Sequence, residues 1–172
     1  MKNNKVKNIA FYGMMIALAL IFSYIETFIP VSAFIPIPGV KLGLANIVVI
    51  FALYTMKNRD AFIISIIRVV ISGFLFGNLT TIVYSLAGGL LSLIVMIILK
   101  KTKLSMIGVS MVGGVCHNIG QLGVAVILTE TIRIAYYVPV LLVSGMITGL
   151  LMGFVAKLIV DRVDKIKKNI KT

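Results

Sequence analysis

Long uncharged apolar runs constrain this chain more than any other feature. Six stretches qualify as candidate membrane spans: 9–29, 42–56, 61–76, 80–99, 104–129 and 134–156. A bilayer core about 30 Å thick takes roughly 20 helical residues, and only the second and third stretches are shorter. Those two can be tilted neighbours, helices that extend into their loops, or one re-entrant pair. We therefore expect an all-α fold, an integral membrane bundle of about six transmembrane helices.

Composition agrees with this class. With 60% hydrophobic and 13% charged residues, the chain is neither an ordinary soluble domain nor disordered. The single cysteine, Cys116, excludes an internal disulfide framework. No CxxC or HExxH spacing occurs, so we expect no metal site and no cofactor. The first span lacks a small-residue cleavage site before Glu26, which favours an uncleaved helix over a signal peptide.

Basic residues indicate the orientation. The chain has 17 Lys and Arg against 5 Asp and Glu, a net charge of +12. With a cytoplasmic N-terminus, 14 of the 17 fall in inside segments: Lys2, Lys5, Lys7, Lys57, Arg59, Lys100, Lys101, Lys103, Lys157, Arg162, Lys165, Lys167, Lys168 and Lys171. Outside loops hold only Lys41 and Arg133, and Arg68 lies within a span. This bias predicts a multi-pass plasma-membrane protein with both termini cytoplasmic. The basic tail 157–172 would face anionic lipid, and no nucleic-acid partner is expected.

Arg68 is the most informative polar residue inside the predicted membrane. It sits near the middle of 61–76, where an unpaired Arg costs roughly 2.5–3.5 kcal/mol on insertion scales. It must therefore face a ligand, a cavity or a structural partner. Glu26 and backbone carbonyls are the structural alternatives.

A second polar group lies on the fifth span. His117, Asn118 and Gln121 are three or four residues apart, which places them on one helical face. The face can bind a ligand, or it can hold helices together through hydrogen bonds. A lone His without a second His, Cys or clustered carboxylate does not indicate a metal site.

Most of this polarity falls in the outer half of the predicted bundle. Such a distribution indicates a pocket that opens outward, whereas a proton-coupled carrier would need polar groups through the full thickness. The connection 30–41, PVSAFIPIPGVK, is apolar and rich in proline, so it can cap a pocket or lie in the membrane interface. The candidate substrate-binding residues are Glu26, Lys41, Asn46, Arg68, Asn78, Tyr84, His117, Asn118 and Gln121.

Two stripes of small residues allow close helix approach. One, on the first span, is formed by Ala10, Gly13 and Ala17, and the other, on the sixth, by Gly145, Gly149 and Gly153. Each stripe can pack inside the bundle or dock a separate subunit.

Four segments together carry a family resemblance: PGVKLGLAN (38–46), RVVISGFLFGNL (68–79), SLAGGLLSLIVM (85–96) and GGVCHNIGQL (113–122). In order and spacing they resemble the Gx transporter family, also labelled heptaprenyl diphosphate synthase component I. That family is similar to the S components of energy-coupling factor transporters, small six-helix membrane subunits that bind a substrate from outside.

This resemblance implies an uptake subunit for a small vitamin-like or flavin-like molecule. Its partners would be a transmembrane coupling subunit, docked on Ala10, Gly13 and Ala17, and two cytoplasmic ATPase subunits. The chain has no GxxxxGK[ST] loop and cannot supply the ATPase itself. It also has no Asp-rich cluster to hold Mg²⁺-bridged diphosphates, so we expect no enzymatic activity. The family's other label leaves a second function open, an accessory membrane subunit for heptaprenyl diphosphate or quinone synthesis.

Overall fold

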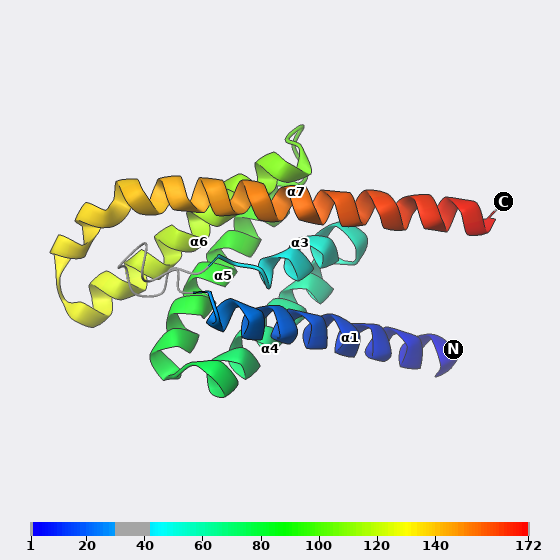
Figure 1. Cartoon of the computed structure of the whole chain (residues 1–172), viewed down its shortest axis with the longest axis horizontal. Helices are drawn as coiled ribbons and strands as arrows, with labels where there is room; N and C mark the ends of the chain where they lie inside the picture. The colour runs from blue at the N-terminus through cyan, green and yellow to red at the C-terminus, as the bar shows by residue number, and fades with distance from the viewer. Residues whose placement is uncertain (1, 30–41, 172) are drawn as a thin grey trace.

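The computed structural model describes residues 2–29 and 42–171, and this part of the chain is all-α (Figure 1). It contains six α-helices and one 3₁₀ helix: α1 (Lys2–Thr27), α3 (Asn46–Thr55), α4 (Asn58–Phe76), α5 (Leu79–Leu99), α6 (Met106–Thr129), η1 (Ile132–Tyr137) and α7 (Val138–Lys171). The expected all-α bundle is confirmed. The predicted turn between the third and fourth spans is also present, since Gly77 ends α4 and Asn78 caps α5.

Four helical stretches within the described residues are long and apolar enough to cross a membrane. They are Asn8–Thr27, Leu79–Leu99, Met106–Thr129 and Ile132–Asn169. The two short predicted spans do not reach this standard, because α3 has only 10 residues and α4 carries Arg59, Asp60 and Arg68. Several long apolar helices in one chain define a multi-pass membrane protein.

The short helix α3 lies at the centre of the packing. Six of its ten residues are buried: Ile47, Val48, Val49, Ile50, Ala52 and Leu53. They form one core cluster with Met15 and Ala19 of α1, Ala61 and Ile64 of α4, and Leu93 of α5. Because other helices surround it, α3 satisfies its backbone hydrogen bonds inside the protein and need not match the bilayer thickness.

Helices α6 and α7 meet through the glycine stripe of α7. A Cβ at Gly114 would lie 2.2 Å from the Gly145 carbonyl oxygen, and one at Gly149 would lie 2.5 Å from the Ser110 carbonyl oxygen. The Ser110 hydroxyl donates to the Gly149 carbonyl at 2.7 Å. The stripe on the sixth predicted span is therefore used for internal packing, as close-approaching membrane helices require.

The stripe on α1 behaves differently. Ala10, Gly13 and Ala17 are all exposed, and a Cβ at Gly13 would have nothing within 4 Å. The face of α1 that packs inward carries Met15 and Ala19 instead. The internal-packing interpretation is therefore wrong for this stripe. The two core residues of α1, Met15 and Ala19, are four residues apart and lie on the opposite side of the helix.

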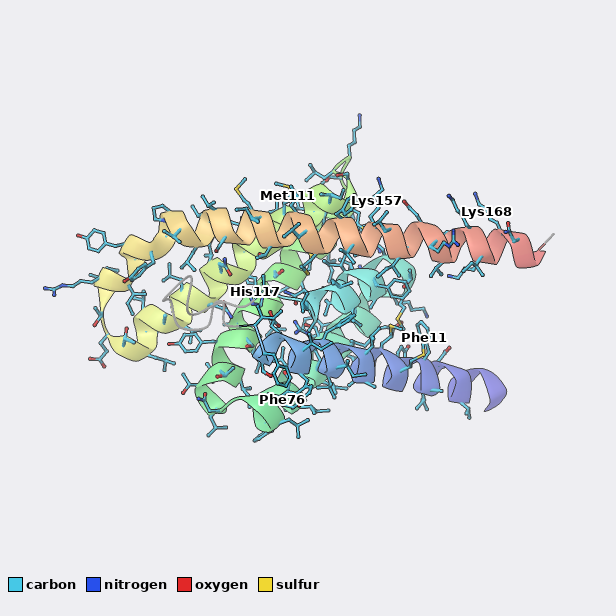
Figure 2. All side chains as sticks on the ribbon, viewed as in Figure 1. Phe11, Phe76, Met111, His117, Lys157 and Lys168 are labelled. Atoms are coloured by element: carbon cyan, nitrogen blue, oxygen red, sulfur yellow. The ribbon has the colours of Figure 1, made fainter. Side chains whose placement is uncertain are left out.

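Helix α7 continues well beyond the predicted span 134–156. It runs to Lys171 without a break, so the expected basic tail is helical through that residue. Lysine and arginine are good helix formers, which explains why the helix outlasts the apolar run. Figure 1 shows the N- and C-termini at the same end of the long axis, and Figure 2 shows Lys168 on the part of α7 that extends past α3 to α6.

Candidate functional site

Arg68 joins two helices inside the bundle. Its side chain is only 8% exposed, and its Nη2 donates to Oδ1 of Asn46 at 2.5 Å. Asn46 is the first residue of α3, so the pair connects the start of α3 to the middle of α4. The predicted intramembrane arginine therefore has a described hydrogen-bond partner, and this partner is an amide on a neighbouring helix.

A glycine turn leads the chain into this site. Gly43 has a φ of +79°, in the left-handed region that favours glycine. Its carbonyl accepts from the Asn46 backbone N–H at 2.8 Å, and its own N–H donates to the Glu26 carboxylate. A Cβ at Gly43 would lie 3.0 Å from Nδ2 of Asn46. Glycine thus lets Glu26, from the last turn of α1, contact the backbone just before α3.

These groups surround a cavity of about 40 Å³, which we call the arginine cavity. Its lining is largely polar: Ser23, Glu26, Gly43, Asn46, Arg68, Val69, Ser72, Ser85, His117 and Gln121. Five of the predicted substrate-binding residues therefore meet here although they come from four helices. Glu26 is also within electrostatic reach of the Arg68 guanidinium.

The three serines of this cavity, Ser23, Ser72 and Ser85, are not among the predicted site residues. Ser72 follows Arg68 by one helical turn, and Ser23 precedes Glu26 by three residues. Both spacings place the serine on the same helical face as the charged residue, so a search for helical neighbours of Arg68 and Glu26 finds them. Ser85 on α5 carries no comparable signal, because only the packing of α5 against α4 brings it to the cavity.

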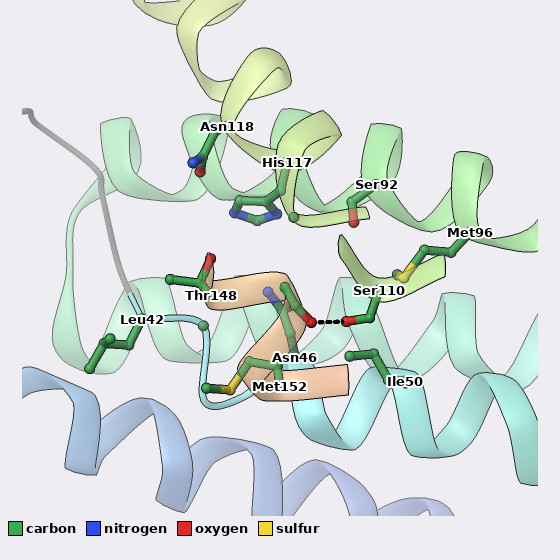
Figure 3. A pocket seen from close by; sticks show the side chains of 13 residues that line it. Leu42, Asn46, Ile50, Ser92, Met96, Ser110, His117, Asn118, Thr148 and Met152 are labelled. Atoms are coloured by element: carbon green, nitrogen blue, oxygen red, sulfur yellow. Dashed lines mark hydrogen bonds between the residues drawn. The ribbon is translucent and has the colours of Figure 1, made fainter. Parts of the chain in front are cut away.

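A second cavity of about 40 Å³, the central cavity, adjoins the first and shares Gly43, Asn46 and His117 with it. Its remaining lining combines hydroxyls, apolar groups and two thioethers: Leu42, Ile50, Ser92, Met96, Ser110, Gly114, Asn118, Thr148, Gly149 and Met152. Figure 3 shows the His117 ring and Ser92 on one side of this cavity, with Asn46, Ile50 and Met152 on the other. His117 is thus the α6 side chain that faces both cavities.

Asn118 joins α6 to α7 through its side-chain amide. It is buried, and its Nδ2 donates to the Leu141 carbonyl at 2.7 Å and to the Ser144 hydroxyl at 3.1 Å. Both acceptors belong to α7. The hydrogen-bond-cluster interpretation therefore applies to Asn118, although the residue also lines the central cavity.

Two of the predicted site residues that the structure describes, Asn78 and Tyr84, line neither cavity. Asn78 is exposed and caps α5, where its Oδ1 accepts from the Thr81 N–H at 2.8 Å and the Thr81 hydroxyl at 3.0 Å. Tyr84 is half-buried and lines neither cavity. Lys41 lies outside the described residues, as does the connection 30–41 that was predicted to cap a pocket.

The chemistry of the two cavities is hydrogen bonding and charge recognition. Guanidinium, imidazole, amide and hydroxyl groups converge on them together with one carboxylate. Among the described residues, no group of three His, Cys, Asp or Glu side chains could hold a metal ion. The arrangement suits noncovalent recognition of a polar group within an apolar bundle.

Long apolar helices around internal polar cavities place this chain among multi-pass membrane proteins. The model of the family described as heptaprenyl diphosphate synthase component I matches residues 15–159. The match spans more than half of the chain, so the chain belongs to the heptaprenyl diphosphate synthase component I family. Searches of curated proteins and of solved structures gave no match.

Proposed function

We propose that this protein is the substrate-binding membrane subunit, or S component, of an energy-coupling factor type uptake transporter for a small vitamin-like or flavin-like molecule. The observation that carries this proposal is the arginine cavity. A membrane bundle needs no buried Arg, Asn, Gln and His for folding alone, and such groups mark ligand pathways when they gather around one space.

The size of the cavities limits how such a ligand binds. Pockets for vitamin-sized molecules hold roughly 300–1,000 Å³, whereas each cavity holds about 40 Å³. Only a single functional group of the ligand fits the arginine cavity as it stands. In this proposal, binding of the whole molecule separates the helices around Asn46 and His117, where the two cavities meet.

The exposed stripe of α1 supports docking of a partner subunit. Ala10, Gly13 and Ala17 form an exposed stripe of small residues on α1, flanked by the exposed side chains of Val6 and Ile21. A Cβ at Gly13 meets nothing within 4 Å. Small residues of this kind let a second helix approach closely in a membrane. The proposed occupant is the transmembrane coupling subunit, which in turn recruits two cytoplasmic ATPase subunits because this chain has no P-loop.

The location follows from the charge distribution. The proposal places the chain in the plasma membrane with both termini cytoplasmic, so that the basic ends stay inside. The binding subunit carries no catalytic chemistry of its own in this proposal.

The family description favours one alternative, an accessory membrane subunit for heptaprenyl diphosphate or quinone synthesis. Chain elongation needs Mg²⁺ held by clustered carboxylates, and the whole chain has only 5 Asp and Glu. In this alternative a separate soluble synthase would supply the catalytic site, and the bundle would hold it at the membrane.

Co-purification separates the two functions. The full-length protein, tagged and extracted in mild detergent from its native cells, is expected to recover a second membrane protein and two ATPases, identified by mass spectrometry. Recovery of a soluble prenyl synthase without ATPases would overturn the transport proposal.

A matched pair of variants tests the docking surface. Gly13→Leu adds a large side chain to the stripe and is expected to abolish recovery of the coupling subunit. Leu18→Phe enlarges an exposed residue next to Ala17 in sequence but about 100° around the helix, so recovery should persist. Both variants should keep the thermal unfolding midpoint of the isolated protein, since both sites are exposed. Equal recovery with both variants would exclude this stripe as the docking site.

A further inference from the structure

We infer that the arginine cavity is a subsite for an oxyanion, a carboxylate or phosphate group of the transported molecule, and that this group competes with the carboxylate of Glu26. The inference rests on the proposed function, because it names the chemical class of ligand that the same site would take.

The hydrogen bonding of Arg68 is incomplete. Its Nη2 donates to Asn46, but its Nε is buried and has no hydrogen-bond partner among the described residues. A buried donor without a partner is costly, and a guanidinium offers a planar fork that matches two oxygens of a carboxylate or phosphate. The unused Nε belongs to a side chain that lines the cavity, where an oxyanion would complete its bonding.

The N-terminal end of α3 borders the same cavity. Helix α3 begins at Asn46. The N–H groups of Asn46 and Ile47 donate to the carbonyls of Gly43 and Leu44, so this helix end contributes its dipole rather than free donors. The first N–H groups of a helix carry partial positive charge and attract anions. Asn46 and Gly43 line the arginine cavity, so the positive end of α3 and the Arg68 guanidinium border one cavity.

A carboxylate of the protein already lies at this cavity. Glu26 accepts from the Gly43 N–H and lies within electrostatic reach of Arg68. The cavity of about 40 Å³ is far smaller than the roughly 300–1,000 Å³ of a pocket for a whole small molecule, so it suits a single small group rather than a ring system. A ligand oxyanion would therefore enter against the negative charge of Glu26.

The two possible roles of Glu26, ligand contact and competitor, predict opposite changes in ligand affinity when its charge is removed. If Glu26 accepted a hydrogen bond from a neutral or cationic ligand, removal of its charge would weaken binding. If Glu26 competes with an oxyanion, Glu26→Gln strengthens binding, and the Gln side-chain oxygen can still accept from the Gly43 N–H.

The test uses the detergent-solubilised full-length protein with sodium phosphate and sodium acetate as probes, and sodium chloride at equal ionic strength as reference. We expect phosphate, acetate or both to raise the thermal unfolding midpoint, with the more effective probe indicating the ligand group. Glu26→Gln should lower the apparent Kd of that probe about 5-fold or more, the usual range for coupled sites. Glu130→Gln, the same change at an exposed residue at the end of α6, should leave the Kd unchanged.

Arg68→Lys provides the second arm, because it keeps a positive charge but removes Nε and the fork. It is expected to abolish the probe-induced shift. If this variant does not fold, the Glu26→Gln and Glu130→Gln pair decides the question alone. Equal shifts with chloride, no shift with either oxyanion, or weaker binding in Glu26→Gln would each overturn the inference. None of these outcomes affects the co-purification result. They would exclude an oxyanion as the ligand group but would not overturn the transport proposal.

Discussion

At the scale of single residues, the polar face of α6 divides into two roles. Asn118 and Gln121 are both buried and lie less than one turn apart. The side-chain amide of Asn118 donates to Leu141 and Ser144 of α7, whereas Gln121 lines the arginine cavity. One residue therefore joins two helices, and its neighbour borders the proposed ligand site.

We predict that Asn118→Ala lowers the free energy of unfolding by about 1–2 kcal/mol, because two interhelical hydrogen bonds are lost. Gln121→Ala should have a smaller effect on stability and should reduce substrate uptake instead. Thermal unfolding in detergent and uptake in cells measure the two effects. A larger stability loss in Gln121→Ala would show that both residues are structural.

At the scale of elements, α3 is held at both ends by side chains from other helices. Asn46 at its start accepts from Arg68. At its other end, Nζ of Lys100 donates to the Leu53 carbonyl at 2.5 Å and lies 5.2 Å from the centre of the Tyr54 ring. A cation near the last carbonyls of a helix is favourable, so a helix of only 10 residues is anchored in place.

Lys100→Met should therefore destabilise the protein by about 1.5–3 kcal/mol, the usual contribution of a hydrogen bond to a charged group. The neighbouring Lys101 is exposed, and Lys101→Met should change stability by less than about 0.5 kcal/mol. Unfolding midpoints of the two variants, measured side by side, check this prediction. Equal midpoints would mean that Lys100 does not hold α3.

The close contact between α6 and α7 depends on glycine. Gly114 has no room for a Cβ beside the Gly145 carbonyl, whereas a Cβ at Gly123 would have nothing within 4 Å. Both residues lie on α6, so their comparison separates packing from helix propensity.

We expect Gly114→Ala to cost about 1–3 kcal/mol of stability through overpacking. Gly123→Ala should be neutral or stabilising by up to about 1 kcal/mol, because alanine favours helix more than glycine does. Thermal unfolding of the two purified variants provides the measurement. Comparable stability of both would contradict the close approach of α6 and α7.

At the scale of the whole molecule, the length of α7 and the position of the termini agree with one orientation. With 34 residues, α7 is about 51 Å long and exceeds a 30 Å bilayer core by roughly 20 Å. The described basic side chains of its last half are exposed: Lys157, Arg162, Lys165, Lys167 and Lys168. Both termini lie at one end of the molecule (Figure 1), as the proposed topology with both termini on one side of the membrane requires.

Cysteine labelling tests this orientation. In a Cys116→Ser background, Arg133→Cys should react with a membrane-impermeant maleimide in intact cells. Lys165→Cys should react only after the cells are permeabilised, because the proposed topology places α7's end in the cytoplasm. Labelling of Lys165→Cys in intact cells would reverse the proposed topology.

The sequence by itself determined the class of this protein. Runs of apolar residues are a local property of the chain, and so are the turn at Gly77–Asn78 and the excess of positive charge on alternate connections. The same reasoning marked Arg68, because a charge inside an apolar run is costly wherever the neighbouring helices lie.

Only the tertiary structure decided what each polar residue contacts. Arg68 binds Asn46 and Asn118 binds Leu141, partners more than 20 residues away in sequence, and no local pattern specifies such pairs. Periodicity likewise identified two small-residue stripes but could not tell that one is covered by α6 and the other is exposed. The physical reason is that the cost of a buried polar group can be read from one helix, whereas the groups that offset it are supplied by the packing of the others.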